Sequence, residues 1–400
     1  MTTATPGTAA ELHADMVKKI TSSRPGLDGS VVEALRTVPR HLFLPDATLD
    51  EAYNPYKAVI TKTATDGTHL SCASVATLVA GMLDELRVRP GDRVFEVGAG
   101  TGYNAALLAE LTGPDGLVVT ADIDAEVTGQ ASTALAAGGY RDVRVLTRDG
   151  ALGDDTDAPF DKIIVTVGAC DVPDAWFTQL VPGGRMVLPL RWRGQTRGVA
   201  FVKGDDGVLR SESVFLCGFV PMIGQDVERA AIIHTDPLVQ IHYDIDQDID
   251  PAQLAGILDT LRTSAWSGIT VGSQDPIDGI WLRATATDPA VCRINASPAA
   301  VSTDVCTPFI PNLSPMLIAG SSLVYLAKRR LDGPDPVYEL GAHGHGPDGR
   351  ALAERLCGHI RTWNTDRNAR PSLIVTPLTA QASIPDDAII KKDCAITVAY

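Results

Sequence analysis

Three glycines and an acidic residue lie close together in the segment VFEVGAGTGYNAALLAEL. The apolar run Arg93–Val97 predicts a buried strand that carries Glu96. It is followed by Gly98, Gly100 and Gly102 and then by an apolar helix. Glycines at a strand-to-helix turn let the backbone approach a bound ligand closely. Dinucleotide sites space them as G-x-G-x-x-G, whereas this segment reads G-x-G-x-G, which favours S-adenosylmethionine over NAD. We therefore expect Glu96 and the three glycines to bind S-adenosylmethionine.

Two further acidic residues follow the next two predicted strands. Asp122 ends the second strand, about 20 residues beyond the glycine turn, where a carboxylate can accept hydrogen bonds from both ribose hydroxyls. Asp149 and Gly150 follow the third strand and are expected to border the adenine ring. Asp149 is also a residue type that caps helices, and this alternative stays open. The order of the glycines and both acids agrees with one nucleotide site.

The elements that position these residues alternate between strand and helix. Two helices are expected first, over residues 9–20 and Ser30–Val38, because their apolar residues recur at helical spacing. From about residue 68 onward, βα units with continuous apolar strands predict a doubly wound, mostly parallel sheet with helices on both faces, as in Rossmann-like domains. The expected elements are helix Ala73–Leu86, strand Arg93–Val97, a helix to Leu111, strand Leu117–Ala121, helix 125–137, strands Val143–Leu146 and Lys162–Val167, helix 174–180 and strand Arg185–Leu190.

The regular alternation of strands and helices ends after Met222. Strands are expected near 238–245, 278–286 and 372–378, and helices near 251–264, 314–330 and 348–363. They no longer alternate one for one, which is typical of an α+β domain. We therefore expect a nucleotide-binding domain over 1–225 and a second, α+β domain over 226–400.

Composition excludes several classes of function. The net charge of −15 is unfavourable for nucleic acid and for an anionic membrane surface. The seven cysteines are scattered without a C-x-x-C pair, which favours reduced thiols over a disulfide framework or a zinc site. No signal peptide and no apolar run long enough to span a membrane are seen in the sequence, so a cytoplasmic protein is expected.

Beyond the glycine turn, an ordered set of segments across roughly residues 10–225 is similar to the protein-L-isoaspartate O-methyltransferases. The resemblance implies an S-adenosylmethionine-binding α/β domain with an N-terminal helical layer over the acceptor site, and S-adenosylhomocysteine as product. The segments that carry it are Ser30–Asp46 with Ala52 and Tyr53, Thr68–Ala73, EVGAGTGYNAALLAEL, the RDG at 148–150, Phe160–Thr166 and Val172–Leu190.

The resemblance also implies roles around the acceptor. Ser71 occupies the serine position of the family's T-x-S-x-P segment, beside cofactor and acceptor, and Tyr53 and Thr166 are expected to help bind the acceptor. His69 stands where threonine is usual, Ala73 where proline is usual, and Cys170 replaces a usual proline. These departures are expected around the acceptor pocket, so they concern the substrate more than the cofactor.

Alternatives stay open for two of these residues. Ser71 is expected to orient the acceptor carboxylate, but it is also a natural cap for a helix that begins near Ala73. His69, if protonated, is able to pair with that anion, or it simply packs. Cys72 has no evident partner base, so a nucleophilic role is not expected.

The chemistry of the acceptor explains why no catalytic relay is visible. A carboxylate is already ionised at neutral pH, its ordinary pKa being about 4, and so attacks a sulfonium methyl without a general base. Positioning is then what the protein must supply. The methyl ester of aspartate or isoaspartate closes to a succinimide when the next amide nitrogen displaces methanol, and hydrolysis gives aspartyl and isoaspartyl products. The same steps repair isoaspartate or install an aspartimide in a constrained peptide.

The added residues 226–400 resemble the C-terminal extensions of family members found with ribosomally made, modified peptides of lanthipeptide, lasso and graspetide pathways. This resemblance implies a cyclised precursor peptide as substrate, bound or covered by the extension. General isoaspartate repair is the alternative, with a small-molecule O- or N-methyltransferase and a non-enzymatic binding module further behind. A role in stabilisation or oligomerisation also stays open for the extension, and no oligomeric state is predicted.

Three polar clusters in the extension do not predict a metal site. Asp244, Asp246 and Asp248 alternate like the start of a calcium loop, but the glycine and glutamate that such a loop needs are absent, and a face of exposed acids before a helix is expected. His343-Gly344-His345 lacks a third ligand and is expected in a turn before a helix. The run 328–330 is expected at a solvated helix end, with binding of an acidic peptide as the alternative.

Overall fold

The computed structural model describes residues 7–65, 67, 69–225, 228–380 and 383–400. The chain folds as two compact units, whose main boundary falls between Gln225 and Asp226. The short segments Arg191–Gln195 and Val375–Ala382 depart from a simple division at this point, because the first belongs to unit 2 and the second to unit 1. The assignment of 1–225 and 226–400 to separate functional domains stays a prediction.

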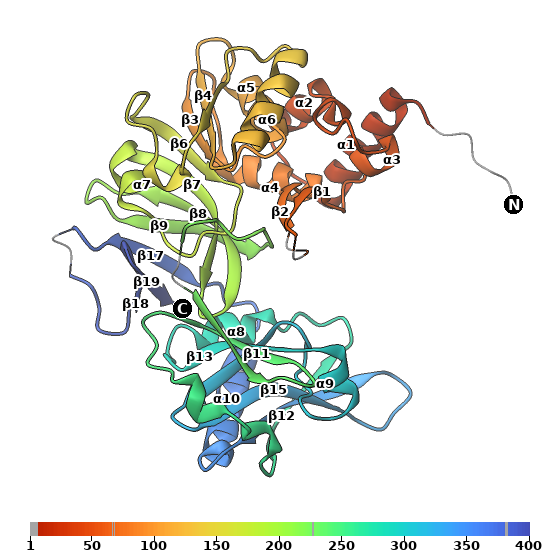
Figure 1. Cartoon of the computed structure of the whole chain (residues 1–400), viewed down its shortest axis with the longest axis vertical. Helices are drawn as coiled ribbons and strands as arrows, with labels where there is room; N and C mark the ends of the chain where they lie inside the picture. Colours follow the sequence, from red (N-terminus) through yellow and green to blue (C-terminus); the bar gives the residue numbers. More distant parts are fainter. Residues whose placement is uncertain (1–6, 66, 68, 226–227, 381–382) are drawn as a thin grey trace, which may run out of the picture. The chain divides into compact units, whose positions relative to one another are not determined.

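Unit 1 begins with a helical layer. Helix α1 starts with a capping box in which Thr8 and Glu11 satisfy each other's backbone N–H groups. Helix α2 packs against α5, and α1 packs against α2 and α4 (Figure 1). The layer comprises α1 (Ala9–Ser23), α2 (Gly29–Thr37), the 3₁₀ turn η1 (Arg40–Phe43) and α3 (Leu49–Ala52), followed by the antiparallel pair β1 (Val59–Thr63) and β2 (His69–Ala73).

The main sheet of unit 1 confirms the doubly wound fold. Neighbouring strands run β9-β8-β7-β6-β3-β4-β5, and the five from β7 to β5 are mutually parallel. The chain moves outward from β3 through β4 to β5 and then returns to β6 on the other side of β3, so the topological switch point lies between β3 and β6. The strands are β3 (Arg93–Val97), β4 (Leu117–Asp122), β5 (Arg144–Thr147), β6 (Phe160–Val165), β7 (Leu180–Trp192), β8 (Gln195–Lys203) and β9 (Leu209–Leu216).

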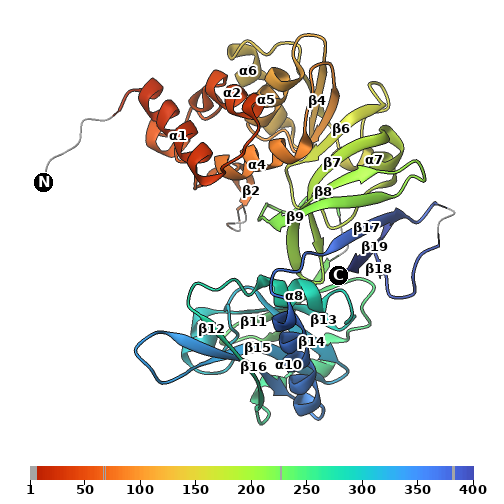
Figure 2. The same ribbon diagram turned by 180° about the vertical axis from the view of Figure 1, so that it is seen from behind.

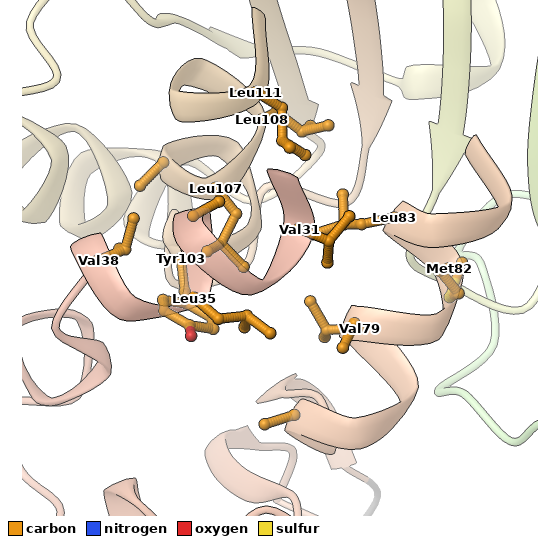
Figure 3. Close-up of a cluster of buried hydrophobic side chains, with 14 of the residues drawn as sticks. Val31, Leu35, Val38, Val79, Met82, Leu83, Tyr103, Leu107, Leu108 and Leu111 are labelled. Atoms are coloured by element: carbon orange, nitrogen blue, oxygen red, sulfur yellow. The ribbon is translucent and has the colours of Figure 1, made fainter. Parts of the chain in front are cut away.

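Helices α4 (Ala76–Leu86), α5 (Tyr103–Thr112), α6 (Ala125–Ala137) and α7 (Asp174–Gln179) and the 3₁₀ turn η2 (Gly150–Leu152) connect these strands. The expected helix from Ala73 therefore begins three residues later, because His69–Ala73 pairs with β1 as a strand. Figure 3 shows how α2, α4 and α5 join in one hydrophobic core, whose labelled side chains are Val31, Leu35, Val38, Val79, Met82, Leu83, Tyr103, Leu107, Leu108 and Leu111. This core fixes the start of α5, which follows the glycine turn directly.

Unit 2 contains a seven-stranded sheet in the order β10-β11-β13-β14-β15-β16-β12, in which all neighbours are antiparallel. Helix α10 packs on β12, β15 and β16 (Figure 2). The elements are β10 (Glu228–His234), β11 (Val239–Asp244), the 3₁₀ turns η3 (Pro251–Leu254) and η4 (Ile257–Asp259), β12 (Thr263–Gly272), α8 (Asp278–Ala284), β13 (Val291–Ala296), α9 (Pro298–Ser302), β14 (Ser314–Ala319), β15 (Ser322–Arg330), β16 (Val337–His345), α10 (Gly349–Thr365), β17 (Ser372–Pro377), which runs from unit 2 into unit 1, β18 (Ile389–Ile390) and β19 (Cys394–Ala399). An antiparallel sheet with a helix on it is an α+β architecture.

Several predictions of secondary structure within unit 2 were wrong. The expected helix over 314–330 is the hairpin of β14 and β15, and the expected strand over 278–286 is the helix α8. The expected helix over 251–264 is reduced to two 3₁₀ turns before β12. Continuous apolar runs such as these have no clear period, and pairing with neighbouring strands decides their structure.

The polar clusters of unit 2 also differ from expectation. Asp244 is buried, with its carboxylate 2.8 Å from Lys391 Nζ, so it is not part of an exposed acidic face. His343 and His345 lie in strand β16 and not in a turn. The run 328–330 ends a strand, where the Lys328 ammonium lies 4.3 Å from the Phe309 ring centre and 5.2 Å from that of Tyr338. These groups therefore serve packing and ion pairing within the sheet.

Within the described ranges, the structure contains no helix that combines the length and apolar character needed to cross a membrane.

Candidate functional site

An open cavity lies in unit 1, at the carboxyl ends of β3, β4 and β6. It lies at the switch point of the sheet, where doubly wound folds bind their ligands. Its walls come from η1, the end of β2, the glycine turn and the start of α5, the ends of β4, β5 and β6, and residues Val220–Ile223.

The glycine turn after β3 depends on glycine at each of its three positions. Gly98, Gly100 and Gly102 have φ values of +98°, +49° and +84°, a region that other residues rarely adopt. A Cβ on Gly98 would lie 2.8 Å from Thr166 Oγ1, and one on Gly102 would lie 3.1 Å from Leu135 Cγ. Gly98 and Gly100 line the cavity, whereas Gly102 lies behind it and packs against α6. The expected set therefore divides into two glycines that face a ligand and one that places α5.

Glu96 lines the cavity with a fully buried side chain. Its Oε1 accepts a hydrogen bond of 2.7 Å from Asn104 Nδ2, while Oε2 has no hydrogen-bond partner among the described residues. Burial raises the pKa of the Glu96 carboxyl to about 7. A buried acceptor without a partner is costly, and a ligand that donates a hydrogen bond relieves that cost.

Asp122 joins the glycine turn to the end of β4. Its Oδ2 accepts from the Gly100 backbone N–H at 3.2 Å and its Oδ1 from the Asp124 N–H at 3.2 Å. Burial raises the pKa of the Asp122 carboxyl. The side chain lines the cavity beside the turn, so one carboxylate both braces Gly100 and faces the ligand space.

Asp149 and Gly150 line the cavity at the end of β5. Asp149 Oδ1 accepts from the Ala151 N–H at 2.9 Å and caps the 3₁₀ turn η2, so capping and a place in the cavity occur together. Gly150 has no room for a side chain, since a Cβ would lie 2.5 Å from Val97 Cγ1. The Gly150 carbonyl accepts from Trp176 Nε1 at 2.9 Å, which fixes this wall.

Ser71 and Thr166 line the cavity from two other strand ends. Ser71 lies in β2, where its Oγ accepts from Thr61 Oγ1 at 3.1 Å. Because α4 begins at Ala76 and has Val75 as its N-cap, the alternative that Ser71 caps this helix was wrong. Thr166 Oγ1 donates to the Gly98 carbonyl at 2.8 Å, so its hydroxyl hydrogen holds the glycine turn.

Tyr53 and His69 are not among the residues that line the cavity. The buried Tyr53 hydroxyl lies 2.6 Å from His41 Nδ1, and the Tyr53 ring stacks on His13. His69 is exposed at the start of β2, and Thr68 before it lies outside the described residues. Cys170 is buried and does not line the cavity either, and its backbone N–H donates to Gln225 Oε1. Roles for Tyr53 and His69 in acceptor binding stay predictions that this cavity does not support.

Comparison with known proteins agrees with this geometry. Residues 11–227 match the family described as protein-L-isoaspartate(D-aspartate) O-methyltransferase. The protein-L-isoaspartate O-methyltransferase of Methanopyrus kandleri is 42% identical over 197 residues, which are 49% of this chain and 84% of that protein. Protein-L-isoaspartate O-methyltransferase 1 of Cupriavidus necator is 36% identical over 233 residues, which are 56% of this chain and 86% of that protein.

The chain belongs to the protein-L-isoaspartate(D-aspartate) O-methyltransferase family. It is an S-adenosylmethionine-dependent methyltransferase. A solved structure described as a protein-L-isoaspartate O-methyltransferase matches with a TM-score of 0.52 at 18% identity, over 97% of this chain and 99% of that chain. At this identity the match shows a shared fold, and its coverage extends that likeness into unit 2 of the methyltransferase.

The residues of this methyltransferase fit its cofactor. The unpartnered Glu96 Oε2 and the Asp122 carboxylate offer hydrogen-bond acceptors for hydroxyl or ammonium groups. The backbone at Gly98 and Gly100 lies open to the cavity, as a close approach of ligand to chain requires. Hydrogen-bond acceptors beside a turn with glycine at three positions suit the hydroxyl groups of a ribose and the ammonium group of an amino acid.

Several residues of the methyltransferase cavity were missed from the sequence. Arg40 and Tyr103 line it with buried side chains, and Asn104 holds Glu96. Asn104 could have been noticed in the sequence, because it lies in the first turn of the helix that follows the glycines. Residues Val220–Ile223 carry no motif, and they reach the cavity through a bridge between Pro221 and Gly168 after β6.

Proposed function

We propose that this enzyme methylates the side-chain carboxylate of an aspartyl or isoaspartyl residue, and that its acceptor is a cyclised, ribosomally made peptide. The methylation of a carboxylate is supported by one cavity. The glycine turn at Gly98 and Gly100 and the carboxylate of Asp122, which suit a nucleoside, line it together with the hydroxyl of Ser71. The family match supports a carboxyl acceptor, because the family's description names isoaspartate and D-aspartate.

The donor half of the cavity has residues for each part of S-adenosylmethionine. Asp122 accepts from the ribose hydroxyls, and Asp149 and Gly150 border the adenine. Glu96 Oε2 accepts a further hydrogen bond from the ligand, while Gly98 and Gly100 leave space for its chain. When bound, the cofactor supplies an electrophilic methyl group on a sulfonium.

The acceptor half needs only to position an anion. No histidine and no lysine is found among the described residues that line the cavity, so an imidazole or amine base is not at hand for a hydroxyl or amine acceptor. A carboxylate needs none, because it is ionised at neutral pH with an ordinary pKa of about 4. The Ser71 hydroxyl, which accepts from Thr61, has its own hydrogen left to donate to the acceptor carboxylate.

Methyl transfer prepares the acceptor for a second step. The carboxylate oxygen bonds to the methyl carbon and the methyl–sulfur bond breaks, which leaves S-adenosylhomocysteine. In the peptide, the next backbone amide nitrogen then attacks the ester carbonyl, loses its proton and expels methanol, which closes a succinimide. Water opens the ring to aspartyl or isoaspartyl products. The enzyme's part ends with the ester.

The preference for a constrained peptide is supported by departures from the family's usual residues at His69, Ala73 and Cys170. Of these, Ala73 lines the cavity, where a smaller and more flexible residue than proline leaves room for a different acceptor. We also propose that residues 226–400 form a domain that helps bind this acceptor. The seven cysteines, all within the described residues, form no disulfide bond, which fits a cytoplasmic site for this activity.

General repair of isoaspartyl proteins is the second candidate, and one observation favours it. The solved structure described as a protein-L-isoaspartate O-methyltransferase matches 97% of this chain, which includes most of unit 2. The C-terminal extension by itself therefore does not distinguish a peptide-tailoring enzyme from a repair enzyme.

The test is incubation of the full chain and S-adenosylmethionine with three matched peptides, followed by mass spectrometry. The peptides are a cyclised peptide with an internal aspartate, its linear form, and a linear peptide with isoaspartate. We expect the cyclised peptide to gain the mass of one methylene as ester and then to lose one water relative to the starting peptide as succinimide. The linear aspartyl peptide is the control and should stay unchanged.

Each result decides between the candidates. Efficient methylation of the linear isoaspartyl peptide together with an unchanged cyclised peptide would contradict peptide tailoring and support repair. A methyl group on a hydroxyl or amine in place of a carboxylate would contradict both.

A further inference from the structure

Arg40 occupies an unusual position in the wall of the cavity. It begins η1 with only 1% of its surface exposed, and it lines the cavity together with Ser74 and Tyr103. Its Nη2 donates to the Ser74 carbonyl at 2.7 Å, and its guanidinium carbon lies 5.0 Å from the Tyr103 ring centre. Its Nε and Nη1 have no hydrogen-bond partner among the described residues. A buried cation at the edge of a ligand space thus has two unused donors.

Two other buried arginines, Arg185 and Arg193, are paired with carboxylates. Arg185, 4% exposed, has its Nη1 2.6 Å from Glu212 Oε2. Arg193, also 4% exposed, pairs with Asp244 and Asp246. No such pair with a carboxylate is found for Arg40 in the described part of the chain.

An unpaired buried charge is costly. Taking a guanidinium out of water is repaid only by an opposite charge and by hydrogen bonds to its remaining N–H groups. Arginine does not escape this cost by losing its proton, because its ordinary pKa lies above about 12. Burial lowers the pKa of Arg40, which reports the same desolvation. The π face of Tyr103 offsets part of the cost, at about 0.5–2 kcal/mol for such contacts. The balance points to an anion that arrives with the ligands.

The ligands of the proposed function carry one kind of anion. S-adenosylmethionine has a carboxylate in its methionine part, and the acceptor has the carboxylate to be methylated. Carboxylates are the natural partners of arginine N–H groups, through short, charge-assisted hydrogen bonds. Both carboxylates are already ionised and need no base, but both must be held in a fixed orientation.

We propose that Arg40 binds a ligand carboxylate in the cavity. This inference rests on the proposed function, since both candidate carboxylates belong to its donor and acceptor. The Ser74 carbonyl and the Tyr103 ring hold the guanidinium in place, and its Nε and Nη1 are the groups left to donate. A bound carboxylate then completes the ion pair that the chain itself omits.

The test uses Arg40→Met in the full chain, with Arg185→Met as matched control. Both substitutions remove a buried arginine from unit 1, but Arg185 does not line the cavity and is paired within the protein. Binding of S-adenosylhomocysteine and of 5′-methylthioadenosine is measured by calorimetry, and KM is measured for the best methylated peptide. 5′-Methylthioadenosine lacks the amino acid part and hence the carboxylate.

Two outcomes support the proposal, and they distinguish the carboxylate of the donor from that of the acceptor. If the donor carboxylate is the partner, Arg40→Met lowers the affinity for S-adenosylhomocysteine by about 10- to 100-fold, the range of one charged hydrogen-bonding contact. The affinity for 5′-methylthioadenosine then stays unchanged. If the acceptor carboxylate is the partner, the peptide KM rises by a similar factor and both nucleosides bind as before. Arg185→Met should leave all three values near those of the wild type.

The proposal is overturned if folded Arg40→Met binds S-adenosylhomocysteine and turns over the peptide with unchanged affinity and KM. Equal weakening of both nucleosides would also overturn it, since a distorted cavity explains that result. Should Arg40→Met fail to fold, Arg40→Gln replaces it, because its amide keeps a hydrogen-bonding group at this position while the charge is lost. If the wild-type enzyme methylates no peptide, the proposed function is refuted. The role of Arg40 is then tested by the binding of S-adenosylhomocysteine and 5′-methylthioadenosine alone.

Discussion

The buried carboxylates of the cavity show how single residues prepare a site. Glu96 is fully buried, yet the chain supplies a hydrogen bond to only one of its oxygens, through Asn104. Asp122 accepts hydrogen bonds from the backbone N–H groups of Gly100 and Asp124 and also lines the cavity. Such groups raise the free energy of the empty protein and gain partners when a ligand binds. Their cost is the reason to assign them to binding.

Asp122→Ala tests this assignment. It removes an anionic acceptor from the cavity, so we expect the affinity for S-adenosylhomocysteine to fall by about 10- to 100-fold, as for the loss of a charged hydrogen bond. Asp124→Ala is the matched control, because Asp124 lies two residues away, pairs with Lys62 at 2.6 Å and does not line the cavity. Calorimetric titration of both variants decides. Equal affinities for the two would refute the role of Asp122.

Glu96→Gln tests the cost of the buried acid. The pKa of Glu96 is about 7 in the folded chain and ordinarily 4.5, so the folded state holds this proton more tightly than the unfolded state. The stability from this group is therefore present below pH 4.5 and lost as pH rises through 7, a difference of about 3 kcal/mol. Glutamine does not ionise and still accepts from Asn104.

We therefore expect ligand-free Glu96→Gln to have a higher Tm than the wild type at about pH 8, with a much smaller difference at about pH 5. Thermal unfolding followed by circular dichroism at the two pH values measures it. A lower Tm for the variant at the higher pH would show that the ionised carboxylate is stabilised in the fold.

Which site residues a sequence reveals depends on how local their geometry is. Glu96, Gly98 and Asp122 were predictable, because each sits at a fixed offset from the end of a strand. Arg40 was not, because one arginine after a proline has no period and its place in the cavity depends on packing of the helical layer. Tyr53 was named from the family resemblance alone, and its hydroxyl lies against His41, so its role in acceptor binding stays a prediction.

At the scale of elements, the strand ends and glycine turns form a rigid frame. The turn after β5 brings Gly150 against β3, with no room for a Cβ beside Val97. The Thr166 hydroxyl ties the end of β6 to the turn after β3. Close backbone contacts of this kind position the ligand walls without any flexible side chain.

Gly150→Ala is expected to strain this frame. Its Cβ would lie 2.5 Å from Val97 Cγ1, and overpacking of a buried contact costs about 1–3 kcal/mol. Gly129→Ala is the control, because Gly129 lies inside α6 with nothing within 4 Å of an added Cβ, and alanine in a helix gains roughly 0.5–1 kcal/mol over glycine. In denaturant unfolding, we expect a lower free energy of unfolding than the wild type for Gly150→Ala and a higher one for Gly129→Ala. A Gly150→Ala protein as stable as Gly129→Ala would contradict the close packing.

The elements of unit 1 were largely predictable and those of unit 2 were not. In unit 1, buried parallel strands alternate with helices and glycine turns mark the boundaries. In unit 2, the apolar stretch 314–330 has no helical or strand period, and Gly320 with φ +53° turns it into the hairpin of β14 and β15. Cross-strand pairing over long sequence distances decided the outcome, and a local pattern does not contain it.

At the scale of the whole molecule, the two units do not divide the chain at a single point. Residues Val375–Ala382 return to unit 1 long after its other segments, with Val375 and Thr376 buried. The Thr379 hydroxyl donates to Asp174 of α7 at 3.2 Å. The late segment is therefore part of the first unit's structure.

A chain that ends at Gln225 should for this reason be less stable than unit 1 in the full protein. Loss of about 1 kcal/mol lowers Tm by roughly 2–4 °C in a domain of this size, and we expect a larger decrease because buried apolar surface is exposed. Scanning calorimetry of the full and shortened chains tests it. An unchanged Tm for the first unit would show that Val375–Ala382 contributes nothing to it.

The central claim is that the cavity at the switch point of unit 1 binds S-adenosylmethionine. Isothermal titration of the full wild-type chain with S-adenosylhomocysteine tests it most directly. We expect saturable binding with one ligand per chain, lost or strongly weakened in Asp122→Ala. The absence of any binding to the folded wild-type chain would contradict the account.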